Sequence, residues 1–158
     1  MLKRRVLDAI RLVLQDDDAL DLEASKYDKY LEEGCDWQHL TMANGTKPTV
    51  FVVQPITHRQ RIAMSRLDEG FEQTAFMVRC GLVNVENFEV SRDGKPTVLG
   101  APKRARYGDA GEIVSEDWLQ DAGFTMNEYG ALALAITAIS EAQIPLLKRL
   151  GDRATETE

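Results

Sequence analysis

The first apolar positions of the chain recur every three or four residues, which places them on one face of a helix. They are Leu2, Val6, Ile10 and Val13. This spacing predicts an amphipathic helix over residues 2–14, which ends where an acidic run begins at Asp16. Three interpretations stay open for this helix: it packs on its own body, docks in a groove of a partner protein, or lies on a membrane surface. It has no aromatic residue, which argues against the membrane.

Two pairs of turn residues between apolar runs predict β-hairpins. Asn44-Gly45 predicts a hairpin over residues 37–54, and Asp93-Gly94 predicts a second one over residues 87–99. Residues 49–53 of the first hairpin are apolar on both faces, a pattern typical of a central strand that is buried on both sides.

Capping sequences mark the beginnings of further helices. Thr57 with Gln60, and Thr125 with Glu128, both match the capping box, and Ser115 is a favoured N-cap residue. Phe124 and Tyr129 flank the second box in the positions of a hydrophobic staple. The apolar segment at residues 71–83 predicts another helix, which is buried on most of its circumference. The predicted helices cover residues 58–69, residues 71–83, a short stretch through Trp118 and Leu119, and an amphipathic stretch from Met126 until Pro145. Phe71 begins the apolar stripe of the second helix, and one face of the last helix holds Tyr129, Leu132, Ile136 and Ile139.

These elements predict a single α+β domain, in which a small sheet of two hairpins packs against three or more helices, with an N-terminal amphipathic helix. Residues 1–36 hold this helix and the acidic segment and are able to project as an arm. Residues 37–151 form the globular domain, and residues 152–158 form a frayed tail. A chain of 158 residues buries enough surface to fold without a metal or a disulfide.

The charge pattern bears on the kind of partner. A net charge of −7 repels phosphate backbones and anionic membranes unless basic residues gather on one face. One part of the chain does concentrate them: Arg92, Lys95, Lys103, Arg104 and Arg106. Either they are a solvated loop, or they form a patch that meets nucleic acid or an acidic protein surface. The acidic segment of a second copy is such a surface, and this favours a homo-oligomer.

Candidate chemistry is sparse. His39 and His58 are the two histidines, and neither lies in a recognisable catalytic pattern with a nucleophile. Cys35 and His39 offer at most half of a zinc site. Cys80 lies in an apolar run and is predicted to be buried. We therefore expect no catalytic residue, no metal, no cofactor and no enzymatic activity. The longest apolar stretch, residues 131–139, is too short to span a membrane, and no secretory signal is visible.

Four short motifs follow one another along the second part of the chain. They are VFVVQPIT at residues 50–57, LVNVENF at residues 82–88, DGKP at residues 93–96 and SEDWL at residues 115–119. Over about residues 48–143, their order resembles that of small tailed-bacteriophage proteins, namely tail assembly chaperones and minor tail components. The N-terminal segment and the basic loop at residues 100–111 depart from that pattern, and projecting segments of this kind also suit a permanent virion subunit.

This resemblance implies a non-enzymatic phage morphogenesis protein that binds other tail or virion proteins. It would serve as a structural tail, baseplate or connector subunit, or as a tail assembly chaperone, present in several copies in an assembly. It would occur in the host cytoplasm during assembly, and in the virion tail if it is a permanent subunit. The apolar face of the N-terminal helix and the five basic residues are the expected partner-binding residues. The alternative is a small regulatory or nucleic-acid-binding protein that uses the basic patch.

Overall fold

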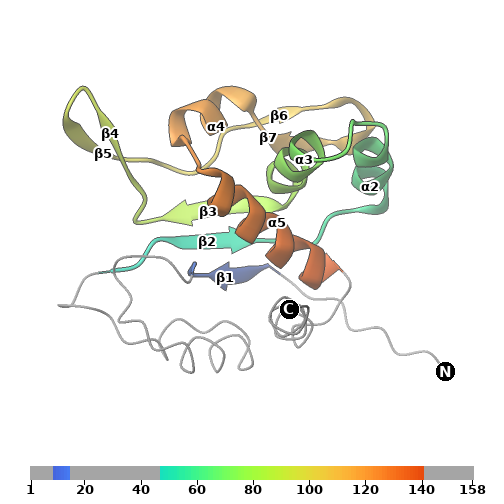
Figure 1. Ribbon diagram of the computed structural model, residues 1–158, viewed down its shortest axis with the longest axis horizontal. Helices are drawn as coiled ribbons and strands as arrows, with labels where there is room; N and C mark the ends of the chain where they lie inside the picture. The colour runs from blue at the N-terminus through green and yellow to red at the C-terminus, as the bar shows by residue number, and fades with distance from the viewer. Residues whose placement is uncertain (1–8, 15–46, 141–158) are drawn as a thin grey trace.

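The computed structural model describes residues 9–14 and 47–140, and they form an α+β fold (Figure 1). Three strands make an antiparallel sheet in the order β1-β2-β3: β1 (Ile10–Leu12), β2 (Val50–Val53) and β3 (Leu82–Glu86). The predicted central strand is confirmed, because β2 pairs with β1 on one edge and with β3 on the other.

Helices cover one face of this sheet. α2 (His58–Ser65) follows β2, and α3 (Phe71–Gly81) leads directly into β3. α5 (Met126–Ser140) packs against α3 and contacts β2, and it crosses the sheet in Figure 1. The predicted capping box at Thr57 is present in full, since its hydroxyl accepts from the backbone of Gln60 while the Gln60 side chain accepts from the backbone of Thr57.

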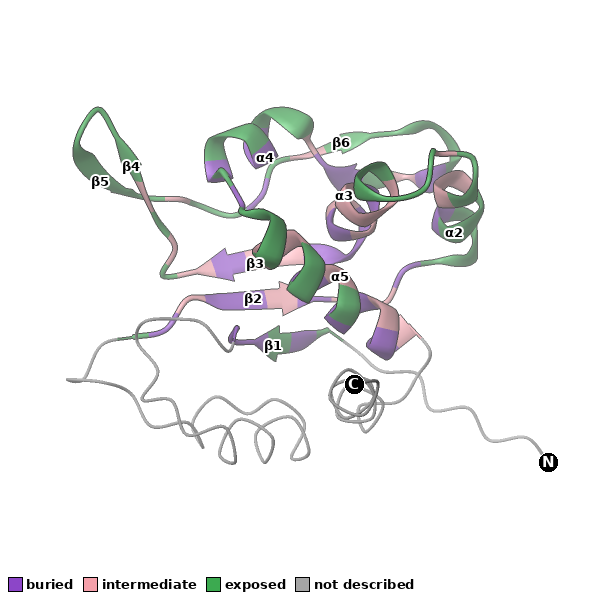
Figure 2. Ribbon diagram, in the orientation of Figure 1, coloured by how far each residue is buried: buried purple, intermediate pink, exposed green. Residues whose placement is uncertain are grey.

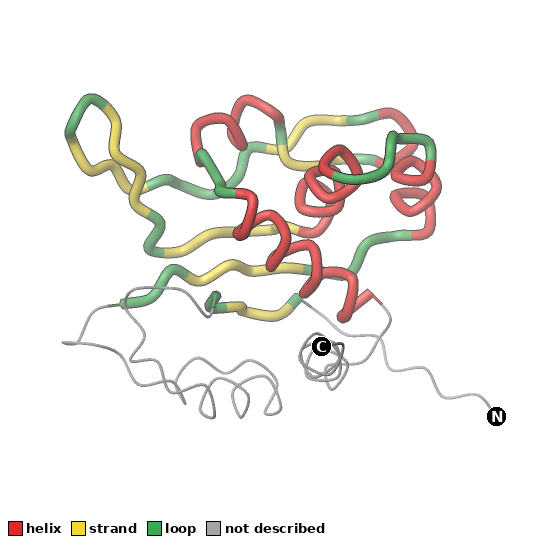
Figure 3. The backbone as a smooth tube through the Cα atoms, viewed as in Figure 1, coloured by secondary structure: helices red, strands yellow, loops and turns green. Residues whose placement is uncertain are grey.

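The segment between β3 and α5 forms two further hairpins and a short helix (Figure 3). β4 (Glu89–Arg92) and β5 (Lys95–Val98) form the hairpin predicted from Asp93-Gly94, and both turn residues have positive φ, 52° and 75°, as a type I′ turn requires. β6 (Arg104–Arg106), the 3₁₀ turn η3 (Gly108–Ala110) and β7 (Glu112–Val114) form the other hairpin. α4 (Glu116–Ala122) follows, with the Ser115 hydroxyl as its predicted N-cap.

The core lies between the three-stranded sheet and the helices, and β7 and α4 close it (Figure 2). Three residues of the predicted inner face of α5, Leu132, Ile136 and Ile139, are confirmed as core because they are at most 1% exposed, whereas the fourth, Tyr129, is only half-buried. Their partners come from distant parts of the chain, including Val53 of β2, Val78 of α3 and Ile113 of β7, all fully buried. One continuous apolar core therefore joins all the helices of the described residues to the sheet.

The structure corrects the prediction of a helix over residues 2–14. Residues 10–12 are a strand, in which Ile10 and Leu12 are buried and Arg11 lies between them, forming an ion pair with Glu86 of β3. Val13 is also fully buried. Residues 2–8 lie outside the described residues. Four apolar residues among five fit either period, and pairing with β2 decides in favour of the strand.

Three other predictions also change. The predicted hairpin over residues 37–54 would pair β2 with residues 37–43, but β1 and β3 occupy the two edges of β2, so this pairing is wrong. Residues 37–46 themselves lie outside the described part of the chain. The helix from Phe71 ends at Gly81, and residues 82–86 form β3 instead. The basic loop at residues 100–111 contains β6, which pairs with β7 directly after the loop; periodicity does not reveal this hairpin because each strand has only three residues.

Candidate functional site

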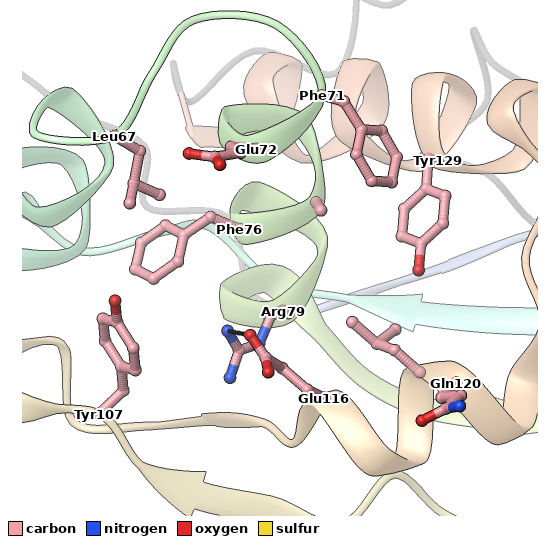
Figure 4. Close-up of a pocket in the computed structure, with 11 residues that line it drawn as sticks. Leu67, Phe71, Glu72, Phe76, Arg79, Tyr107, Glu116, Gln120 and Tyr129 are labelled. Carbon is pink, nitrogen blue, oxygen red and sulfur yellow. Dashed lines mark hydrogen bonds and ion pairs between the residues drawn. The ribbon is translucent and has the colours of Figure 1, made fainter.

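A pocket of about 460 Å³ lies beside α3 and is open to solvent (Figure 4). Its walls come from the turn between α2 and α3, from α3 itself, from the residue before η3, and from α4 and α5. We call it the α3 groove, and its lining residues are Leu67, Phe71, Glu72, Ala75, Phe76, Arg79, Tyr107, Glu116, Leu119, Gln120 and Tyr129.

Two aromatic rings form one end of the α3 groove. Phe71, the first residue of α3, is 47% exposed, and its ring meets that of Tyr129 edge to face, with the centroids 5.2 Å apart. Tyr129 is held from behind by Phe124, whose ring centroid is 5.6 Å away. Phe124 precedes the Thr125 cap and Tyr129 lies in the first turn of α5, so this contact is the predicted hydrophobic staple. The staple fixes the orientation of one groove wall.

Arg79 and its partners form the other end. Its Nε donates to the carbonyl of Val114 at 2.8 Å, and its guanidinium lies 5.5 Å from the ring centroid of Tyr107. Its Nη1 forms an ion pair with Glu116 at 3.3 Å. The Arg79 side chain is only 13% exposed, whereas that of Glu116 is 83% exposed. The guanidinium is thus a fixed part of the wall, and its charge is balanced by a carboxylate at the rim.

The rim of the α3 groove is acidic. Among the lining residues, two carboxylates, Glu72 and Glu116, stand against the single cation of Arg79. Glu72 is exposed and forms no ion pair within the described part of the chain. Among the residues next to the lining in sequence, the acidic ones also outnumber the basic ones: Asp68, Asp117, Asp121 and Glu128 against Arg66 and Arg106. An apolar floor with an acidic rim is suited to a partner that is apolar and basic.

The apolar residues predicted to bind a partner have a different role. Ile10 is 8% exposed and Val13 is fully buried, and both belong to the core of their own chain. They are unavailable to a partner while the sheet is intact. Leu2 and Val6 lie outside the described residues.

The five basic residues do not gather on one patch. Arg92, on the β4–β5 hairpin, pairs with Asp121 of α4 at 3.1 Å, and Lys95 lies beside it in the hairpin ladder. Arg104 is half-buried and donates to the carbonyl of Cys80 at 3.3 Å. Lys103 and Arg106 are exposed on or beside β6. Figure 1 shows β4–β5 and β6 at well-separated places, so two small basic groups replace the predicted patch.

The titratable residues that the sequence offered as candidates for chemistry are not brought together. His58 is exposed at the first position of α2, and Cys80 is buried, as predicted. Cys35 and His39 lie outside the described residues. In residues 9–14 and 47–140, no group of three or more His, Cys, Asp or Glu side chains is placed to hold a metal ion.

Cys80 provides a first prediction. Burial raises the pKa of its thiol to about 12, against the opposing effects of Arg79 and Arg104. The native thiol should therefore not react with a disulfide reagent at pH 8 in a Cys35→Ser variant, and should react fully in urea. The pKa of the Cys80 thiol is higher in the folded chain, about 12, than in the unfolded chain, about 9. The contribution of Cys80 to stability is therefore complete below about pH 9 and is lost as the pH rises towards 12. Rapid reaction in the native state at pH 8 would contradict this.

Periodicity did not identify the α3 groove. It placed Phe71 and Tyr129 on helix faces turned to the core, and it assigned no role to Arg79 or Tyr107. The sequence signal closest to the groove is the staple between Phe124 and Tyr129, which marks a rigid aromatic pair at the beginning of a helix.

Comparison of the chain with protein-family models, with curated proteins and with solved structures found no match. No helix of the described residues is long and apolar enough to cross a membrane.

Proposed function

We propose that this chain is a non-enzymatic protein that binds other proteins through the α3 groove, as a component of bacteriophage tail assembly. The observation that carries the proposal is the α3 groove itself, which has an apolar floor, aromatic walls held in place by their neighbours, and an acidic rim. The binding partner is an amphipathic segment of another tail or virion protein. The resemblance of residues 48–143 to tail assembly chaperones and minor tail components supports this class of partner.

The walls of the groove have the properties of a peptide-binding surface. Aromatic residues that neighbours already hold in place lose little conformational freedom on binding, so they contribute strongly to affinity. Phe71 and Tyr129 are held by each other, and Tyr107 is held between Phe76 and Arg79. Helices bind to grooves of this kind with their apolar face, through residues spaced three or four positions apart.

The β4–β5 hairpin supports a role in an assembly. Residues 91–98 are exposed, and the hairpin projects from the body in Figure 1. The Arg92–Asp121 ion pair connects it to α4, and the bond from the Leu99 amide to the Phe88 carbonyl closes the base of the hairpin. An isolated two-stranded hairpin is marginal in water, so contact with a neighbouring subunit would stabilise it. It is a second surface for a partner. The alternative of a nucleic-acid-binding protein has less support, because the basic residues are divided between two places.

Two matched substitutions test the proposal. Phe71 and Leu134 are equally exposed, 47% and 46%, and both are on helices, but only Phe71 lines the groove. Glutamine keeps helix propensity while it removes the apolar surface. In a phage that encodes the protein, we expect Phe71→Gln to reduce the yield of complete tails at least about tenfold, the loss typical of an interface hot spot. Leu134→Gln should behave like the wild type.

The outcome is measured by counting infectious particles and tails by electron microscopy. Circular dichroism establishes that both variants are folded. Equal yields for the two variants would contradict the groove as the binding site. Mass spectrometry of purified particles then separates a permanent virion subunit, which is present, from an assembly chaperone, which is absent.

A further inference from the structure

The α3 groove restricts the charge and composition of whatever binds in it. Its floor is apolar and its rim carries Glu72 and Glu116, with one carboxylate in excess over Arg79. Exposed ion pairs contribute little each, but like charges that face each other across an interface are unfavourable. The occupant should therefore present apolar side chains together with Lys or Arg, and no acidic cluster.

One segment of this same chain has that composition. Residues 1–7 are Met-Leu-Lys-Arg-Arg-Val-Leu, with four apolar residues, three basic residues and no acidic one. Leu2 and Val6 are four positions apart, and Lys3, Arg4 and Arg5 lie between them. The acidic segment after Asp16 has the opposite charge character and would be repelled by the rim. Residues 144–150 are apolar with two basic residues, so they are the nearest competitor.

We propose that residues 1–7 of one copy bind in the α3 groove of a second copy, which makes the chain a self-associating subunit. This rests on the proposed function, because it takes the groove as a protein-binding site. Lys3, Arg4 and Arg5 lie along the rim beside Glu72 and Glu116, while Leu2 and Val6 contact the aromatic walls.

The position of β1 sets the distance between the segment and the groove of its own chain. Residues 1–7 lead into β1, where Ile10 is opposite Val53, and the adjacent Gln54 donates to Gly81 at the C-terminal end of α3. Phe71 lies at the other end of this 11-residue helix, about 15 Å away. Seven residues span at most about 25 Å even when fully extended. The segment is therefore long enough to reach its own groove, and the sedimentation experiment below separates this arrangement, which leaves the protein monomeric, from exchange between two copies.

Complementation between two damaged copies tests the proposal. A deletion of residues 1–7 keeps the groove and β1 but removes the arm. Phe71→Gln keeps the arm but damages the groove. Sedimentation velocity of the full-length protein should show association that rises with concentration, and each variant alone should associate at least about tenfold more weakly. Mixed in equal amounts, the two variants should form a heterodimer, since one supplies the arm and the other supplies the groove.

A charge-matched pair isolates the role of the rim. Glu72→Gln with Glu116→Gln should weaken self-association about three- to tenfold in 50 mM salt, and the difference should shrink in 500 mM salt. Asp109→Asn with Glu112→Gln makes the same change in net charge at two exposed positions outside the groove lining and the β4–β5 hairpin, and should leave association unchanged. Leu134→Gln serves as the control for lost apolar surface.

Several results would overturn the proposal. One is a full-length protein that stays monomeric at all concentrations, as an arm bound to its own groove requires. Another is a mixture of the two damaged variants that stays monomeric, or a deletion variant that associates like the wild type. A fluorescein-labelled peptide of residues 144–150 that binds the deletion variant more tightly than one of residues 1–7 would assign the groove to the other segment. If Phe71→Gln still lowers the yield of tails after any of these results, the proposed function stands and only this occupant is wrong.

Discussion

Replacing Phe124 with alanine is expected to lower the free energy of unfolding by about 3–5 kcal/mol, the usual cost of truncating a buried phenylalanine. Its side chain is 9% exposed and lies at the centre of an aromatic cluster. The rings of Phe51, Phe88, Trp118 and Tyr129 surround it, with centroids between 5.5 and 6.0 Å away. These rings come from the sheet, from the start of the projecting hairpin, from α4 and from α5. The truncation therefore loosens four elements together.

Urea denaturation followed by circular dichroism measures this loss. Phe124→Leu keeps part of the apolar volume and should cost less than the alanine variant. The loss of edge-to-face contacts, which contribute about 0.5–1.5 kcal/mol per pair, accounts for what leucine does not restore. An alanine variant that lost less than about 1 kcal/mol would show that the cluster is not a determinant of stability.

Replacing Gly81 with alanine is the second large effect, and it acts by overpacking. A Cβ atom at this position would lie 2.6–2.7 Å from three carbon atoms of the Ile136 side chain. Ile136 is fully buried on α5, and a β-branched residue in a helix has one strongly preferred χ1 rotamer. The isoleucine therefore has little freedom to move aside. We expect a loss of about 1–3 kcal/mol.

A double-mutant cycle separates this clash from other effects. Ile136→Ala alone should cost about 2–5 kcal/mol because it leaves a cavity. The double variant should lose less than the sum of the two single losses, because the new methyl group enters the space that isoleucine vacates. Gly130→Ala is the matched control: it lies in α5 with no atom within 4 Å of the added carbon, and it should stabilise the helix by up to about 1 kcal/mol. Additive single and double losses would contradict the close approach of α3 and α5.

Local signals in the sequence predicted those parts of the fold that are decided locally. The caps at Thr57 and Ser115, the Asp93-Gly94 turn and the inner face of α5 each depend on residues within one or two turns of each other, and all are observed. The α+β class followed from them. The burial of Cys80 was also predicted from its apolar neighbours.

The parts that could not be predicted depend on pairing between distant segments. Ile10 and Leu12 are compatible with either a helix or a strand, and the ladder to β2 decides between them. Leu82 continues the apolar stripe of α3, yet the chain turns into β3 there because β2 offers an edge to pair with. The α3 groove has the same cause: Phe71 and Tyr129 are far apart in sequence, and periodicity does not show which residue of an apolar face stays open to solvent.

The position of β1 at the edge of the sheet also bears on how the chain folds. Leu12 and Val50 are 38 positions apart in the chain, so bringing β1 to β2, its partner among the described strands, has an entropic cost that three ladder positions must offset. The β4–β5 and β6–β7 hairpins and the α2–α3 pair join elements that follow one another in the chain, so they are expected to form earlier. Docking of β1 then comes late, and until it occurs the apolar residues Ile10, Leu12, Val13 and Leu14 are exposed on the nascent chain.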